Sequence, residues 1–228
     1  PTATQSASPT DSALPTTTAS PTASATADAG GAVDVDEEAL DRLEVVLLTP
    51  QTAPDGVFTD VEVQRLPLET LETSLTLTGV NPTGECADLI ERINTQVVPG
   101  AGAVLAEYTV DAQHATGFRT NPPEVFTMLA ASQDDEDISE IVGHLPEVCG
   151  SFGGDQTGWV EMTPIPGVEG AARVAMSMVE GGDVMIDMVL GGESDGTEHV
   201  YMGMINVDPD AAAEVMLAQV EAFRDRER

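Results

Sequence analysis

The chain has 228 residues, 41% of them hydrophobic, so it can bury the core of one or two domains. Its 40 acidic residues far outnumber the eight basic ones, which are all arginine, and the net charge is −32. Such a surface repels phosphate backbones and anionic lipid headgroups, which excludes nucleic-acid binding and polybasic membrane attachment. The negative charge has two alternative roles: it keeps the protein soluble, or it recruits cations or a basic partner to the surface. No window of about 18 apolar residues predicts a membrane span.

We predict a disordered stalk over residues 1–33 and a single α+β domain over residues 34–228. The stalk is almost wholly Thr, Ser, Ala and Pro, and it holds too little apolar surface to offset the entropy cost of ordering. Spacers of this composition are typical of exported proteins that stand off a surface. The stalk therefore favours a location in the cell envelope.

The domain is expected to begin with a helix that ends by Pro50, because proline disfavours helical geometry in the residue before it. The apolar side of this helix is Leu40, Leu43 and Leu47. Pro54-Asp55-Gly56 predicts a turn. Residues 57–63 and 75–78 are expected to be irregular strand or extended loop.

The only two cysteines, Cys86 and Cys149, lie on or beside predicted helices. In residues 85–94, apolar residues at helical spacing place Cys86 on the buried face; the run Pro99-Gly100-Ala101-Gly102 then closes this helix. A second helix opens with the acidic residues 134–137, and Asp137 with Glu140 has the spacing of a capping box. Its buried stripe is Ile138, Ile141, Val142 and Leu145, and Pro146 is expected to break it just before Cys149.

A disulfide between Cys86 and Cys149 would tie these two helices together across strands predicted at 104–110 and 125–130. The alternative is that both thiols are buried and free. The remaining chain predicts a four-stranded antiparallel meander followed by a helix with Asp208 as N-cap and Pro209 at its first position. The four predicted strands are 158–164, 172–179, 183–190 and 199–207. The predicted fold is thus an antiparallel sheet, formed by this meander and one or more earlier strands, with helices packed on it.

No pattern for catalysis is visible. The histidines His114, His144 and His199 are far apart, and no HExxH, GxSxG or phosphate-binding glycine loop occurs. Ser151 has no residue to pair with. Consecutive carboxylates such as those at 134–137 do not converge on one ion, so we expect no metal. The sequence therefore predicts a protein that is not an enzyme and has no cofactor.

The methionines of the meander suggest a pocket, because several lie at i, i+2 and so share a face of one strand. Methionine side chains pack adaptably. A face that carries several of them therefore has three alternative roles: part of the core, the lining of a pocket for an apolar ligand, or a Cu(I) site. Trp159 lies at the start of the meander, and its side chain could serve either to pack the core or to bind a ligand. The candidate pocket-lining residues are Met176, Met178, Met188, Met202, Met204 and Trp159.

The ordered pattern of these elements resembles the actinobacterial sensor-domain lipoproteins that are related to the extracellular domain of PknH-like serine/threonine kinases. The resemblance covers about residues 40–224 and is carried by Leu47-Leu48-Thr49-Pro50 ahead of Asp55-Gly56, the Cys86 helix, Cys149-Gly150-Ser151-Phe152, Gly158-Trp159, the strand over 182–190 and the terminal helix. It implies helices packed on a curved antiparallel sheet around a cleft, outside the cell, often with a lipid anchor. This chain can form only one disulfide, fewer than the kinase domains of that group carry, and it has no kinase part.

Together these patterns predict a non-catalytic, sensor-like lipoprotein domain that binds a ligand or partner and is anchored to the outer face of the membrane or to the cell wall. The expected partner is a small apolar molecule or an envelope protein. Contact with the membrane would come only through a lipid anchor upstream of Pro1, which the resemblance implies. The alternatives are an accessory or structural subunit of an envelope or membrane complex, and a lipid carrier.

Overall fold

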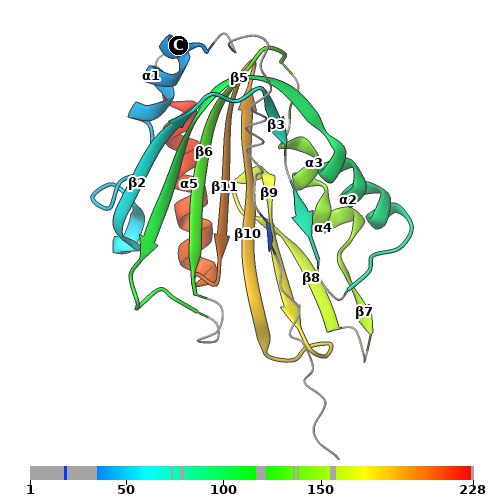
Figure 1. Ribbon diagram of the computed structural model, residues 1–228. Helices are drawn as coiled ribbons and strands as arrows, with labels where there is room; N and C mark the ends of the chain where they lie inside the picture. The colour runs from blue at the N-terminus through cyan, green and yellow to red at the C-terminus, as the bar shows by residue number, and fades with distance from the viewer. Residues whose placement is uncertain are drawn as a thin grey trace, which may run out of the picture.

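The computed structural model describes residues 18–19, 35–72, 74–77, 80–116, 122–135, 137, 139–154 and 158–226. One antiparallel sheet of nine strands forms its centre, with helices on both faces (Figure 1). The predicted α+β class, with an antiparallel sheet packed by helices, is confirmed. None of the helices in the described ranges is long and apolar enough to cross a membrane.

The strands of the large sheet are β2 (Phe58–Leu66), β3 (Thr70–Glu72), β5 (Val97–Val110), β6 (Glu124–Ser132), β7 (Ser151–Gly154), β8 (Gly158–Ile165), β9 (Val168–Ser177), β10 (Val184–Asp195) and β11 (Glu198–Ile205). The helices are α1 (Glu37–Val45), α2 (Glu85–Thr95), α3 (Glu140–Gly143), α4 (Leu145–Val148) and α5 (Pro209–Arg224), with a 3-10 turn η1 (Pro54–Gly56). Two short strands, β1 (Thr18–Ala19) and β4 (Leu75–Thr76), pair separately.

The strand order across the sheet is β2-β5-β6-β11-β10-β9-β8-β7, and β3 pairs with the early part of β5. The strands β8, β9, β10 and β11 are therefore sheet neighbours in chain order, which confirms the predicted meander. The predicted strand at 104–110 is the second half of β5, and the one at 125–130 is most of β6. Residues 58–63 of the predicted segment 57–63 form most of β2, a strand at the edge of the sheet whose pairing with β5 shifts register between Phe58 and Asp60.

Two hydrophobic clusters cover the two faces of the sheet. One lies under α1 and α5, where Leu40 and Leu43 of α1 and Val215 and Met216 of α5 are fully or almost fully buried. The other lies under α2, α3 and α4. In Figure 1, α1 and α5 accordingly lie to one side of the sheet and α2, α3 and α4 to the other. The sheet is thus the middle layer of three.

The terminal helix α5 agrees with its prediction in detail. The Asp208 side chain accepts hydrogen bonds from the backbone amides of Asp210 and Ala211, and Pro209 occupies the first turn, where a missing N–H costs nothing. At the start of α1, Asp36 likewise accepts from the Ala39 amide. Local capping chemistry therefore determines where both helices begin.

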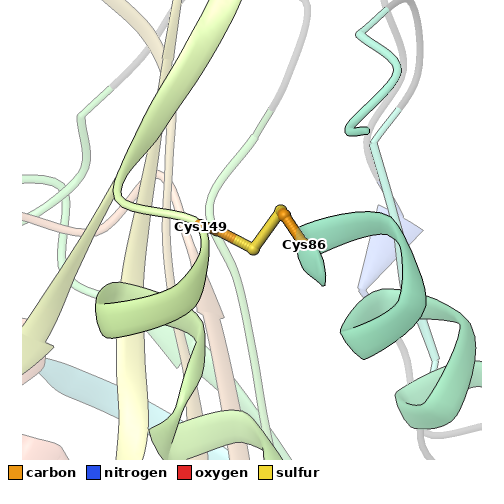
Figure 2. Close-up of a disulfide and its surroundings, with 2 residues drawn as sticks. All are labelled: Cys86 and Cys149. Carbon is orange, nitrogen blue, oxygen red and sulfur yellow. A yellow bond between two sulfur atoms is a disulfide. The ribbon is translucent and has the colours of Figure 1, made fainter. Parts of the chain in front are cut away.

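The Cys86–Cys149 disulfide is present, with a Cα–Cα separation of 4.8 Å. It joins the first turn of α2 to the residue that follows α4 (Figure 2). Cys86 is buried on the same face of α2 as Leu89, Ile90 and Ile93, as its helical spacing predicts. The bridge fastens α2 to the helices that share its side of the sheet.

Two local predictions differ from the structure, and two short strands were missed. Residues 99–102 do not close a helix: β5 already runs through them, with a register shift at Gly102, whose positive φ of 119° a glycine adopts without strain. The second helix does end ahead of Pro146, at Gly143, but a further short helix, α4, then begins at Leu145 with Pro146 in its first turn. The short strands β3 and β7 were not predicted at all.

Two predictions fall outside the described residues. Of the stalk predicted over residues 1–33, the structure describes only Thr18–Ala19, which pairs with β4. The division between stalk and domain stays a prediction. Ile138, expected in the buried stripe of the second helix, also lies outside the described residues.

Candidate functional site

A polar cleft lies around α3, between α2 on one side and β9, β10 and the end of α5 on the other. It consists of two cavities of about 320 and 550 Å³ that share Asp137 and Glu140. The smaller cavity is completed by Arg92, Thr95, Gln96 and Ile141. The larger one is completed by Ser139, His144, Glu169, Gly170, Gly192, Glu193 and Arg224. We call the two together the α2–α3 cleft.

Glycines build the floor of the larger cavity by letting α3 lie directly on β9. A Cβ atom on Gly143 of α3 would lie 2.0 Å from the carbonyl oxygen of Glu169. A Cβ on Gly170 would lie 2.4 Å from the carbonyl oxygen of Gly192 and 2.9 Å from the Ser139 hydroxyl. Contacts that short exclude any side chain at these positions. The floor therefore presents backbone rather than apolar side chains.

Asp137 holds the segment that forms the shared wall. One of its carboxylate oxygens accepts hydrogen bonds from the Ser139 amide (2.8 Å), the Ser139 hydroxyl (2.7 Å) and the Glu140 amide (3.0 Å). Partial burial raises the pKa of the Asp137 carboxyl, but these bonds and one from Ser194 outweigh it and hold the pKa below its ordinary value. Asp137 is therefore a carboxylate near neutral pH. The capping box predicted from the spacing of Asp137 and Glu140 is not formed, because α3 begins at Glu140 with Ser139 as its N-cap, and Asp137 instead binds the amides just ahead of the helix.

The charge of the larger cavity is mainly negative. Its one arginine, Arg224, is paired with Glu193 through contacts to both carboxylate oxygens. Among the described residues, Glu140 and Glu169 form no ion pair, and neither does Arg92 of the smaller cavity. Within the described part of the chain, the larger side of the cleft therefore has the carboxylates of Glu140 and Glu169 outside any ion pair, and its smaller end has the guanidinium of Arg92.

His199 lies beneath the cleft in a row of polar side chains on three central strands. Its Nε2 is 2.8 Å from the Ser132 hydroxyl of β6, and its Nδ1 is 2.9 Å from the Ser194 hydroxyl of β10. Only 1% of His199 is exposed. Burial lowers its pKa to about 4, although the negative charges of Asp137 and Glu198 act the other way. His199 is therefore neutral at neutral pH.

Sequence reasoning missed this row completely. Ser132 and His199 are 67 residues apart, and the pairing of β6 with β11 brings them together. No spacing in the sequence signals such a contact, because a period-two pattern fixes the face of a residue but not its neighbour. The other two histidines are at the surface: the ring of His114 lies 3.2 Å from the Asp55 carbonyl oxygen, and His144 lines the larger cavity.

The predicted pocket-lining residues do not come together on one surface. Met176 and Met188 are buried in the cluster under α2, α3 and α4, whereas Met202 and Met204 are buried in the cluster on the opposite face. Met178 is 56% exposed on the turn after β9, and Trp159 is half-buried on β8. None of these residues lines the α2–α3 cleft. Their role in a pocket stays a prediction.

The described residues contain no group of three or more His, Cys, Asp or Glu side chains arranged to hold a metal ion. The acidic residues before α3 are used differently: the Asp137 carboxylate is occupied by the bonds described above, and the Asp134 carbonyl oxygen lies 2.5 Å from the Ser132 hydroxyl. This segment thus connects the sheet to α3.

Comparison with protein families and with curated proteins found no match. Among solved structures, the chain is similar to an uncharacterized protein from Mycobacterium smegmatis, the Rv0999 ortholog, with 14% identity and a TM-score of 0.42 over 85% of this chain and 100% of that one. It is also similar to the extracellular domain of PknH from Mycobacterium tuberculosis, with 10% identity and a TM-score of 0.38 over 82% of this chain and 97% of that one.

Proposed function

We propose that this chain is a non-catalytic, extracytoplasmic domain that binds a cationic ligand, or a basic group of an envelope partner, in the α2–α3 cleft. The observation that carries the proposal is the larger cavity, where Glu140 and Glu169 have no ion-pair partner among the described residues and Asp137 is held as a carboxylate. Ammonium and guanidinium groups satisfy such carboxylates. The backbone floor and polar walls suit a polar ligand better than the small apolar molecule expected from the methionines.

The disulfide supports an extracytoplasmic location. Disulfides persist in oxidising compartments and are rare where thiols are kept reduced. Attachment to the envelope by a lipid upstream of Pro1 belongs to the same proposal. The encoded precursor tests it, because a precursor without a lipobox cysteine would contradict a lipid anchor.

The buried row of polar residues supports a non-catalytic role. Ser132 and His199 have the atom types of a nucleophile and its base, but His199 is 1% exposed and Ser132 is 6% exposed. The Ser132 hydroxyl also donates a hydrogen bond to the Asp134 carbonyl oxygen at 2.5 Å, so its hydrogen is already engaged. A substrate cannot reach either group without unfolding the segment above them.

The binding proposal is tested by titration calorimetry with two probes, spermidine and an oligolysine peptide, at low and moderate salt. We expect weak binding that falls as salt rises, since exposed charges are screened. Glu140→Gln and Glu169→Gln should each weaken binding about threefold to fivefold, as partly exposed charge pairs are worth up to about 1 kcal/mol. The control Glu62→Gln removes an equal charge from exposed β2 and should change nothing. Equal losses in all three variants would show attraction by net charge alone and contradict a site in the cleft.

Mass spectrometry of material purified gently from the native envelope then identifies the physiological ligand. A stoichiometric polyamine, other amine or basic peptide supports the proposal. A stoichiometric lipid would contradict it and support the lipid-carrier alternative.

The second candidate function is an accessory subunit of an envelope or membrane complex. It is favoured by the turn between β9 and β10 and the start of β10, where Met178, Val179 and Val184 are 56%, 54% and 43% exposed. Large apolar residues gathered on one exposed turn are typical of contact surfaces. Replacing Met178 and Val179 by Ser should abolish co-purification with a partner protein and leave spermidine binding unchanged if this turn is the docking surface.

A further inference from the structure

Arg92 differs from the other arginines that the structure describes. Each of the others contacts at least one carboxylate; they are Arg42, Arg65, Arg173, Arg224 and Arg226. Arg92 contacts none among the described residues, although the chain has a net charge of −32 and carboxylates are plentiful. Its side chain is exposed in the wall of the smaller cavity. The guanidinium of Arg92 is therefore available to an anionic group that enters this cavity.

The smaller cavity lies against a polar stripe of α2. Arg92 and Thr95 of the helix and Gln96, its C-cap, are spaced i, i+3 and i+4, so they lie along one side of α2. The side-chain amide of Gln96 donates a hydrogen bond to the Asp137 carbonyl oxygen at 3.5 Å. This bond joins the stripe to the wall that the two cavities share. Arg92 and the carboxylates of the shared wall therefore line the same cavity.

The charges of the cleft are ordered along its length. Arg92 lines only the smaller cavity, Glu140 lines both, and Glu169 lines only the larger one. Arg224 of the larger cavity does not reverse this order, because both carboxylate oxygens of Glu193 contact it. A ligand that occupies both cavities therefore meets a positive charge at one end and negative charges along the rest.

We propose that the ligand of the α2–α3 cleft is an amine that also carries a carboxylate, of which a free basic amino acid is the smallest example. Its carboxylate binds Arg92, and its ammonium groups bind Glu140 and Glu169. This ligand class goes further than the proposed function and rests on it. A phosphate would suit Arg92 less well than a carboxylate, because nearly two negative charges would then lie beside Asp137 and Glu140 in the same cavity.

Lysine and cadaverine are the matched probes, because cadaverine is lysine without its carboxylate. NMR titration of the full-length, nitrogen-15-labelled chain gives both affinities at moderate salt, which screens long-range attraction. We expect lysine to bind about threefold to fivefold more tightly than cadaverine, as one partly exposed ion pair is worth up to about 1 kcal/mol. Attraction by net charge alone gives the opposite order, since cadaverine carries more positive charge.

A short peptide that ends in lysine distinguishes a peptide ligand from a free amino acid. It is compared with the same peptide as its C-terminal amide. Tighter binding of the free acid supports the proposal with a peptide end as the ligand. Binding of lysine but of neither peptide supports it with a free amino acid.

The decisive variant is Arg92→Gln. It should remove the advantage of lysine over cadaverine and leave the affinity for cadaverine unchanged or slightly higher, because a positive charge is lost. The matched control Arg65→Gln removes an equal charge from β2, at the edge of the sheet, and should keep the preference for lysine. Glu140→Gln should weaken the binding of both ligands.

Amide shifts in the same titrations locate the two ligands. Lysine should shift the amides of Arg92 and Thr95 together with those of Glu140 and Gly170, whereas cadaverine should shift mainly the latter two. Cadaverine that binds in the cleft as tightly as lysine, or an Arg92→Gln variant that still prefers lysine, overturns the role of the carboxylate and leaves a cationic ligand standing. If neither ligand binds, the cationic ligand is wrong as well.

Discussion

Gly143 of α3 and Glu169 of β9 lie so close that a Cβ on the glycine would be 2.0 Å from the glutamate carbonyl oxygen. The helix that walls the cleft therefore contacts the sheet through a residue without a side chain. This contact sets the separation between α3 and the cavity floor. It also makes the position of α3 sensitive to a single methyl group.

We predict that Gly143→Ala lowers the free energy of unfolding by about 1–3 kcal/mol, because the methyl group forces α3 away from β9. Urea unfolding measures the loss. The control is Gly182→Ala, where the nearest atom is a methyl group of exposed Val179 that can move aside. Its effect should stay below about 0.5 kcal/mol. Similar losses in both variants would show that the contact at Glu169 is not tight.

Loss of the disulfide should lower the free energy of unfolding, because the unfolded chain gains conformational freedom. The bridge closes a loop with a sequence separation of 63 residues, which loop-entropy reasoning values at about 4 kcal/mol. We expect the double variant Cys86→Ala with Cys149→Ala to lose about that much in urea unfolding. Alkylation of the unfolded wild-type protein without reductant, read by mass spectrometry, should label neither cysteine. A double variant within about 1 kcal/mol of wild type would contradict the prediction.

Stability should fall in mild acid because of His199. The pKa of the ring is about 4 in the folded protein, against about 6.5 for an unfolded chain, so the unfolded state binds the proton more readily. The neutral ring therefore contributes its full stability above about pH 6.5 and loses it as the pH falls toward 4. The slope approaches about 1.4 kcal/mol per pH unit between these values. His199→Gln should remove that part of the slope in urea unfolding at pH 4.5 to 7.

The control for this pH effect is His144→Gln, which replaces an exposed histidine on the same side of the sheet. It should keep the wild-type slope. If His199→Gln also keeps that slope, other groups cause the loss of stability in acid. The pKa of His199 in the folded protein is then not lowered.

The arginine near the C-terminus should stabilise the protein much more than a surface arginine does. The Arg226 side chain is 3% exposed, lies over the Phe223 ring and is bonded to Glu198, Asp195 and the Phe223 carbonyl. Removing one partner of a buried ion pair leaves an uncompensated charge and costs about 3–5 kcal/mol. We expect Arg226→Met to lose an amount near the lower end of that range in urea unfolding.

The matched control is Arg65→Met. Arg65 also contacts several carboxylates, those of Glu37, Asp41 and Glu44 on α1, but it does so at the surface. Exposed ion pairs contribute about 0–1 kcal/mol. A loss at Arg65 as large as that at Arg226 would mean that the number of contacts matters more than burial.

The chain sequence alone was enough for elements whose signals are local. Asp208 and Pro209 fixed the start of α5, and the spacing of Cys86, Leu89 and Ile93 predicted the buried face of α2. Short turns between alternating segments predicted the meander, because a parallel crossover needs many more residues. These features follow from backbone and side-chain chemistry within a few residues, and the structure confirms them.

Strand register determines which side chains of different strands become neighbours, and the sequence did not predict this. Met202 and Met204 share a face as expected, whereas Met178 lies beyond the end of β9 and is exposed. Met188 of β10 lies opposite Ile205 of β11, and Met204 lies opposite Val189. The period-two pattern of a strand indicates which face each side chain takes, but it does not tell which residue of a neighbouring strand lies beside it. The same pairing placed Ser132 and Ser194 on either side of His199. The cleft depends on the tertiary structure for the same reason, since its carboxylates and glycines come from segments whose contact only folding determines.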